Sequence, residues 1–483
     1  MTDDNTAPVT DETIRPFGIR DKIGYMFGDF GNDFSFILQM MFFMTFYTDV
    51  MGISPAHVGT LFLCARLLDA FTDVGMGRLI DMLKPTKKGR FRPWILRMCI
   101  PVSLASLLMY MPFVVDASYT VRMIYMCVTY IVWGSVFYTS INIPYGSMAA
   151  VVSDKPEHRT SLSVFRSVGA QLANLIISAA LPPFVSAGGN HLVPSRMATA
   201  AIVCAICGVC CYLLCYANVQ ERLSAVIEEE GEPQKASFGV MLGTVVRNRP
   251  LLSLVGAAIC FLIGSQIVGG TTTYIWKDYF KNLPMMSVAQ VVAVLPVFLI
   301  ATVATALSMR YGKKELLVTF LMFSAILSIV TYFLHIHNAI VFIVLYFFIS
   351  IGVGFYNTIV WAMITDVLDY QEVITGERDD GVVYAIYSWA RKLGQALAGW
   401  LVGLALAGVG YSAEIAKAGG EQTASTINGI YMLFLLVPGI LYLVAGLIMW
   451  FIYPLSKKRV AANYETLKSR HGEGTDDLVE KNA

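Results

Sequence analysis

The chain alternates long apolar runs with short polar segments. An apolar run of about 20 residues is long enough to cross a lipid bilayer as a helix. Runs of this kind lie at 23–49, 55–81, 94–115, 119–149, 161–184, 197–217, 251–277, 286–309, 315–335, 338–366, 383–409 and 427–453. The pattern therefore predicts an all-α membrane protein with about twelve transmembrane helices.

A polar segment that contains the sequence EEEGEPQK separates the first six runs from the last six. We therefore expect two six-helix bundles joined by a loop. The expected parts are a cytoplasmic N-terminal tail at 1–21, a first bundle at 22–217, a cytoplasmic central loop at 218–250, a second bundle at 251–453 and a cytoplasmic C-terminal tail at 454–483.

Composition and charge agree with a membrane protein. The chain is 56% hydrophobic and 14% charged, whereas soluble domains are about 25% charged. The net charge of +1 gives no reason to expect a nucleic-acid partner. Lys and Arg gather in alternate loops, such as KPTKKGRFRP and RYGKK, which predicts cytoplasmic termini. The polar, acidic start of the chain does not have the pattern of a secretory signal.

A short repeat relates the two sets of runs. The segments FRSVGAQLAN (165–174) and ARKLGQALAG (390–399) align Arg166 with Arg391 and Gly169 with Gly394. Matching features at corresponding points indicate a parallel duplication. In transporters built in this way, the substrate site lies at the interface of the halves.

The second apolar run carries Arg66, Asp69 and Asp73, whose spacing of three and four residues places them on one helix face. Charged groups inside a bilayer are costly and usually face a cavity or a partner. The two carboxylates could bind a small cation with the hydroxyl of Thr139, because hard cations prefer oxygen ligands, or they could share a proton. In a structural alternative, Arg66 and Lys392 neutralise the acids and lock helices together.

Several other runs carry amide, aromatic and charged side chains of the types that bind sugar hydroxyls. These candidates are Asn32, Asp33, Asn142, Arg166, Asn357, Tyr387 and Trp389. At the cytoplasmic end of the tenth run, Asp366 and Asp369 are expected to pair with Arg92 or Arg378 as a cytoplasmic gate. Asp49, at the end of the first run, is expected to be solvated.

The segment CAICGVCCYLLC contains five of the nine cysteines. The spacing includes C-x-x-C, which can bind metals, but the segment is continuously apolar and has no His or acidic neighbour. Free cysteine packs as a small hydrophobic residue. We therefore expect no cofactor, and no metal beyond a coupling Na+.

The chain resembles the glycoside–pentoside–hexuronide:cation symporters, a branch of the major facilitator superfamily that includes the melibiose permease. The likeness covers about residues 20–455. It is carried by YMFGDFGNDFSF, FYTDVMGI, GTLFLCARLLDAFTDVGMGRLID, GRFRPWIL, INIPYGSM and DVLDYQEVITGERDDGVVYAIYSWARKLGQALAG. The resemblance implies the major facilitator fold and secondary active uptake of glycosides with H+, Na+ or Li+ by alternating access.

The resemblance also implies roles for individual residues. Asp69, Asp73 and Thr139 match the family's cation site, and Lys392 matches a lysine near it. The positions that match sugar contacts are Asp33, Asn142 and Arg166, and further Asn32, Asn357, Tyr387 and Ser388.

Three positions depart from the melibiose permease. Asn32 stands where that protein has Lys, Asn142 where it has Asp, and Gly146 where it has Trp. The small Gly146 leaves room for a different or bulkier sugar. Because Arg166, Arg391 and Lys392 could accept a carboxylate, a hexuronide is an alternative substrate.

The sequence therefore predicts a multi-pass protein of the cell inner (plasma) membrane that imports a glycoside or oligosaccharide together with Na+ or H+. The alternatives are a hexuronide, glucuronide or pentoside:H+ symporter and, in a different class, a membrane sugar sensor. No nucleophile or acid–base motif of an enzyme is found. We expect a monomer whose partners are the glycoside, the cation and the lipid bilayer.

Overall fold

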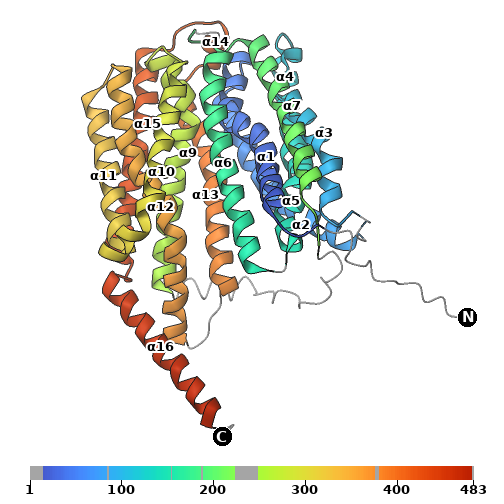
Figure 1. Cartoon of the computed structure of the whole chain (residues 1–483). Helices are drawn as coiled ribbons and strands as arrows, with labels where there is room; N and C mark the ends of the chain where they lie inside the picture. The colour runs from blue at the N-terminus through green and yellow to red at the C-terminus, as the bar shows by residue number, and fades with distance from the viewer. Residues whose placement is uncertain are drawn as a thin grey trace, which may run out of the picture. The chain divides into compact units, whose positions relative to one another are not determined.

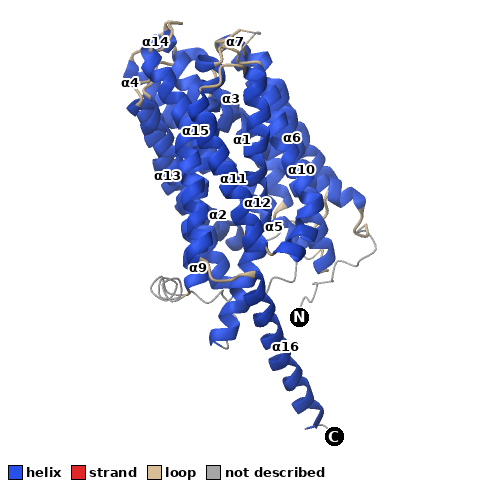
Figure 2. Ribbon diagram, turned by 90° about the vertical axis from the view of Figure 1, so that its left-hand side faces the viewer, coloured by secondary structure: helices blue, strands red, loops and turns tan. Residues whose placement is uncertain are grey.

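The computed structural model describes residues 15–83, 86, 88–153, 155–186, 189–222, 248–375 and 380–480. Across these ranges the regular structure is helical, and Figure 2 shows no β-strand there. The prediction of an all-α protein is confirmed. Every apolar run predicted from the sequence falls on a helix.

The helices of the first half follow the first six apolar runs. They are α1 (Ile19–Thr45) with the π-helical turn η2 (Phe46–Val50), α2 (Pro55–Met82), α3 (Arg92–Leu108), the short η3 (Pro112–Val114), α4 (Tyr119–Ile131), which continues through the π-helical η4 (Val132–Tyr138) into α5 (Thr139–Val152), α6 (Pro156–Val185) and α7 (Pro194–Asn218).

The second half begins after the central segment and ends in a long polar helix (Figure 1). Its elements are α9 (Arg249–Tyr274) with the π-helical turn η5 (Ile275–Tyr279), α10 (Met285–Tyr311), α11 (Lys313–Leu334), α12 (Ala339–Thr375), α13 (Asp380–Gly408), the short α14 (Ala413–Lys417), α15 (Ala424–Leu447) with η6 (Ile448–Ile452), and α16 (Lys457–Glu480).

Within the described residues, nine helical segments are long and apolar enough to cross a membrane. The long helices that do not reach this threshold are α1, α2, α13 and the polar C-terminal α16. The first three of these carry several of the ionisable residues that the sequence singled out, namely Asp33, Asp69, Asp73, Arg391 and Lys392. In α1, α2 and α13, a low apolar content therefore goes together with candidate site residues.

By its contacts the chain forms two compact units. The first comprises Met1–Phe43, Cys64–Ile177 and Val193–Glu232, and the second comprises Met44–Leu63, Ser178–Leu192 and Pro233–Ala483. The division passes through α1, α2 and α6, so that one end of each helix packs with the second half of the chain. The domain boundaries expected from the sequence stay a prediction.

In the first unit, glycines on α1 allow close packing against large aromatic residues. A Cβ atom on Gly28 would lie 2.2 Å from the Tyr145 ring, and one on Gly31 would lie 2.8 Å from the Tyr212 ring. The hydroxyl of Tyr145 also donates to the carbonyl of Tyr25 at 2.7 Å. These contacts fix the rotation of α1 and hence the direction of its polar side chains.

In the second unit, α11 packs on α12 and α15, while α9 packs on α13 and α15. The apolar core contains stacked aromatic pairs, including Phe261 with Tyr356, whose ring centroids are 3.8 Å apart, and Phe320 with Phe355 at 4.1 Å. Such packing substitutes for the hydrophobic driving force that is missing between helices in lipid.

Candidate functional site

An ion pair between a half-exposed arginine and a largely buried aspartate joins α1 to α6 in the first unit. Arg166 donates from Nε to Oδ1 of Asp29 at 3.0 Å, and its guanidinium lies 5.3 Å from the centre of the Tyr145 ring. Asp29 was not among the predicted site residues. Its spacing of four residues from Asp33 is the signal that would have found it, because that spacing puts both carboxyl groups on one face.

The neighbouring Asn32 and Asp33 have different environments. The Asn32 amide nitrogen donates to Oδ1 of Asn142 at 3.4 Å, and its oxygen accepts from the Tyr212 hydroxyl at 2.8 Å. Oδ2 of Asp33 is buried and has no hydrogen-bond partner among the residues that the structure describes. An unsatisfied buried carboxyl oxygen is costly, which favours a role for Asp33 in binding a ligand.

The predicted cation-site residues lie together where α2 faces η4 and the start of α5. The Thr139 hydroxyl donates to Oδ1 of Asp73 at 3.1 Å. The Ser135 hydroxyl donates to Oδ1 of Asp69 at 2.6 Å, and Nη1 of Arg66 lies 3.5 Å from the other Asp69 oxygen. The structure thus brings together all three residues that the sequence assigned to this site.

This cluster adds a residue that the sequence analysis missed. Ser135 lies four residues before Thr139, so both hydroxyls can face α2 across the π-helical segment η4. Asp73 has no ion-pair partner within the described ranges. Two carboxylates and two hydroxyls are an oxygen-rich ligand set of the kind that hard cations prefer.

The second unit contains the remaining predicted substrate residues. Trp361 of α12 and Tyr387 of α13 pack edge to face with ring centroids 5.5 Å apart. The Arg391 guanidinium lies over the Trp361 ring at 5.3 Å. Asn357 and Lys392 are exposed side chains on the same two helices. The side chain of Ser388 is outside the described part of the structure.

Two of the predicted cytoplasmic gate residues, Arg92 and Asp366, have partners inside their own units. Arg92 donates from Nε to the Tyr216 carbonyl at 2.7 Å, and Asp366 accepts from Lys313 at 2.7 Å. Asp369 lies on the same helix as Asp366, and Arg378 is outside the described residues. The pairing expected between these acids and the two arginines stays a prediction.

An ionic cluster in the second unit was not expected from the sequence. Its members are Asp49 of η2, Lys277 and Asp278 of η5, and Tyr411 after α13. Lys277 forms ion pairs with both acids, and its distance to Asp278 is 3.3 Å. The Tyr411 hydroxyl accepts from Lys277 at 2.7 Å and donates to Asp49 at 2.6 Å.

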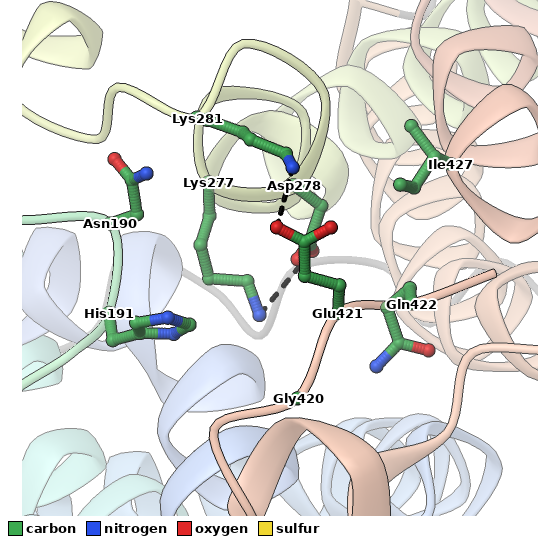
Figure 3. A pocket seen from close by; sticks show the side chains of 9 residues that line it. All are labelled: Asn190, His191, Lys277, Asp278, Lys281, Gly420, Glu421, Gln422 and Ile427. Carbon is green, nitrogen blue, oxygen red and sulfur yellow. Dashed lines mark hydrogen bonds and ion pairs between the residues drawn. The ribbon is translucent and has the colours of Figure 1, made fainter. Parts of the chain in front are cut away.

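The expectation that Asp49 is solvated is wrong, because its side chain is only 8% exposed. The turn after α1 brings it onto the second half of the chain, where it compensates the charge of the buried Lys277. A pocket borders the cluster (Figure 3). It is lined by Asn190, His191, Lys277, Asp278, Lys281, Gly420, Glu421, Gln422 and Ile427.

Comparison with known proteins decides the family. Residues 24–457 match the family model described as MFS/sugar transport protein. The chain belongs to this family. The resemblance to the glycoside–pentoside–hexuronide symporters is confirmed, and the chain is a membrane transporter and not an enzyme. A multi-pass position in the plasma membrane is also supported, as the sequence predicted.

Two relatives of this family member align over nearly the whole chain. An uncharacterized symporter, YjmB, from Bacillus subtilis is 32% identical and covers 96% of this chain and 98% of its own. A glucuronide carrier protein homolog from Escherichia coli is 32% identical and covers 91% of this chain and 93% of its own.

A solved structure agrees with the fold of the transporter. The D-xylose–proton symporter superposes with a TM-score of 0.60 over 91% of this chain and 97% of its own, at 12% sequence identity. At this identity the likeness supports the major facilitator fold and says nothing of the substrate.

Proposed function

We propose that this transporter imports a glycoside together with Na+ or H+ by alternating access. The observation that carries the proposal is the oxygen-rich cluster on α2. Asp73 bonds to the Thr139 hydroxyl but has no ion-pair partner in the described structure. A lone carboxylate on a membrane helix is costly, and a bound cation or proton would remove that cost.

Coupling follows from the charge of this cluster. With no cation bound, Asp69 and Asp73 leave excess negative charge on this face of α2. A conformational change that brings this charge into apolar surroundings is costly. A Na+ held by the two carboxylates and the Ser135 and Thr139 hydroxyls would neutralise that charge, and so would a proton on Asp73. The fully loaded transporter then changes between inward- and outward-open states more readily than a half-loaded one.

The sugar-binding part of the proposal rests on the polar residues of α1, α5 and α6. Arg166 is oriented by Asp29, and Asp33 has a carboxyl oxygen that no described group satisfies. The Asp33 carboxylate can accept hydrogen bonds from sugar hydroxyls, and the Arg166 guanidinium can donate hydrogen bonds to them. The relatives named as a symporter and as a glucuronide carrier homolog support a carbohydrate cargo and coupled transport.

Uptake by proteoliposomes tests this function. The purified protein is supplied with a panel of labelled glycosides under an imposed Na+ gradient, an imposed proton gradient or neither. We expect at least one glycoside to accumulate chemically unchanged above its equilibrium level under one gradient. Sugar binding with no accumulation under either gradient would contradict the proposal and favour a sugar sensor.

A further inference from the structure

A basic cluster forms in the second unit where the end of α10, the start of α11 and the start of α16 meet. Its members are Arg310, Lys314, Lys457 and Lys458. Nζ of Lys457 donates to the carbonyl oxygen of Arg310 at 2.8 Å. Nζ of Lys314 donates to the carbonyl oxygen of Tyr453, which lies between η6 and α16. The first of these bonds places two segments side by side that are 147 positions apart in the sequence.

The basic cluster carries more positive than negative charge. Within the described structure, the carboxylate that contacts it is that of Glu315, which accepts a hydrogen bond from the backbone nitrogen of Lys457 at 3.2 Å. The side chains of Arg310 and Lys458 are exposed, and neither has a hydrogen-bond or ion-pair partner among the residues that the structure describes. One carboxylate cannot balance four cations, so the cluster keeps charge that an external anion can compensate.

The basic loop of the first unit, KPTKKGRFRP, uses its arginines differently. The Arg90 guanidinium donates to the carbonyl oxygen of Ile80 from two nitrogens, at 3.2 and 3.1 Å. Arg92 donates to the carbonyl oxygen of Tyr216 at 2.7 Å and lies over its ring. Lys and Arg gather on one side of most membrane proteins, but in that loop these side chains bind the chain itself. The exposed side chains of the basic cluster therefore need a further explanation.

An exposed apolar surface borders the basic cluster. Trp450 and Phe451 of η6 stack with ring centroids 5.8 Å apart, and they are 55% and 72% exposed. At the end of α10, Met309 and Tyr311 are exposed, and the Arg310 guanidinium lies 5.3 Å from the Tyr311 ring. In a transmembrane protein such side chains contact lipid, and Trp and Tyr prefer the level of the headgroups. The basic cluster therefore lies at the depth of the lipid phosphates.

We propose that the basic cluster binds the phosphate of an anionic phospholipid whose acyl chains lie against Trp450 and Phe451. The planar Arg310 guanidinium can hold two phosphate oxygens with parallel hydrogen bonds, and the ammonium groups of Lys457 and Lys458 add positive charge. Basic residues that directly follow a membrane span attract anionic headgroups in this way. A zwitterionic headgroup brings an ammonium group of its own and leaves the excess charge uncompensated. The inference concerns the lipid contact of the second unit and does not depend on the transported substrate.

Native mass spectrometry of the purified full-length protein in detergent micelles tests this binding. Phosphatidylglycerol and phosphatidylethanolamine with the same acyl chains are titrated separately at fixed ionic strength, and the lipid-bound fraction gives a dissociation constant for each. We expect phosphatidylglycerol to bind about tenfold or more tightly, because each uncompensated cation contributes about a fivefold gain. A large excess of inorganic phosphate should displace little of this lipid, since phosphate lacks the acyl chains. Complete displacement by phosphate would show a site for free anions and overturn the lipid assignment.

Substitutions assign the lipid preference to the cluster. Arg310→Gln and Lys458→Gln should each weaken phosphatidylglycerol binding by about fivefold, and the double variant by about 20-fold. Binding of phosphatidylethanolamine should change by less than about twofold in all three, because its net charge is zero. Trp450→Leu should weaken the binding of both lipids alike, since the acyl chains of both contact the ring.

Arg459 provides a matched control, since it is exposed and adjacent to Lys458 but its guanidinium lies 5.5 Å from the Tyr370 ring of α12. Arg459→Gln should leave both lipid affinities unchanged. The melting temperature without added lipid should be the same for the wild type and the Arg310→Gln/Lys458→Gln variant, and added phosphatidylglycerol should raise it in the wild type alone. Equal affinity of the wild type for the two lipids, or an equal loss in Arg459→Gln and Lys458→Gln, would overturn the inference.

Discussion

The buried ionic cluster of the second unit gives a quantitative prediction about stability. Lys277→Met removes the cation that faces both Asp49 and Asp278 and leaves two buried carboxylates close together. Removal of one partner from a buried ion pair costs about 3–5 kcal/mol. Because Lys277 is 4% exposed, water can compensate little of this loss. We expect a destabilisation in that range.

Asp49→Asn should be milder. The amide oxygen can still accept the hydrogen bond from Tyr411, and Lys277 keeps Asp278 as a counter-ion. The loss is then one charge-assisted hydrogen bond, about 1.5–3 kcal/mol. Reversible unfolding of the purified protein in mixed micelles, followed by tryptophan fluorescence, measures the free energy of unfolding for each variant.

Lys281→Met is the matched control, because Lys281 pairs with Glu421 at 2.6 Å but both side chains are exposed. An exposed pair contributes little to stability, because water and salt screen the two charges. Lys281 holds the pKa of Glu421 below its ordinary value, so the small contribution is present at neutral pH and disappears as the pH falls through that lowered pKa. If Lys277→Met were as stable as Lys281→Met, the buried cluster would have no stabilising role.

Two further sites, each inside one of the two compact units, allow predictions. A Cβ on Gly403 would lie 2.4 Å from the Pro55 carbonyl oxygen, whereas one on Gly408 would meet nothing within 4 Å. Gly403→Ala should therefore reduce transport rate and melting temperature, and Gly408→Ala should change neither measurably; equal effects would contradict the close helix contact. Thr139→Ala and Ser135→Ala should each raise the cation concentration needed for half-maximal uptake by about 5-fold or more, because each change removes one hydrogen bond to a charged group. An unchanged cation dependence in both variants would show that the two hydroxyls do not belong to the cation site.

Much of the fold follows from the sequence because bilayer spans need long apolar helices, and the runs of such residues are easy to recognise. The residues that share one face of a single helix can equally be predicted from their spacing. Asp69 and Asp73 lie on one face of α2 as expected, and Thr139 bonds to Asp73. The family resemblance supplied the pairing of these helices, which the spacing alone does not give.

Contacts between segments far apart in the sequence were harder to predict. Asp49 comes at the end of an apolar run, where a carboxylate is usually solvated, and only the packing of η2 against the second half buries it. Likewise, the pairing of Asp29 with Arg166 joins residues 137 positions apart. Single-helix periodicity carries no information about such partners, because they depend on how helices pack.

In the proposed function, the Asp69 and Asp73 carboxylates of α2 couple sugar movement to a cation. Proteoliposomes that contain Asp69→Asn/Asp73→Asn should therefore lose gradient-driven accumulation of the transported glycoside. The same vesicles should still exchange internal for external sugar, since the sugar-contacting groups remain. Accumulation at the wild-type level by this double variant, under the same imposed gradient, would show that these carboxylates do not couple transport to a cation.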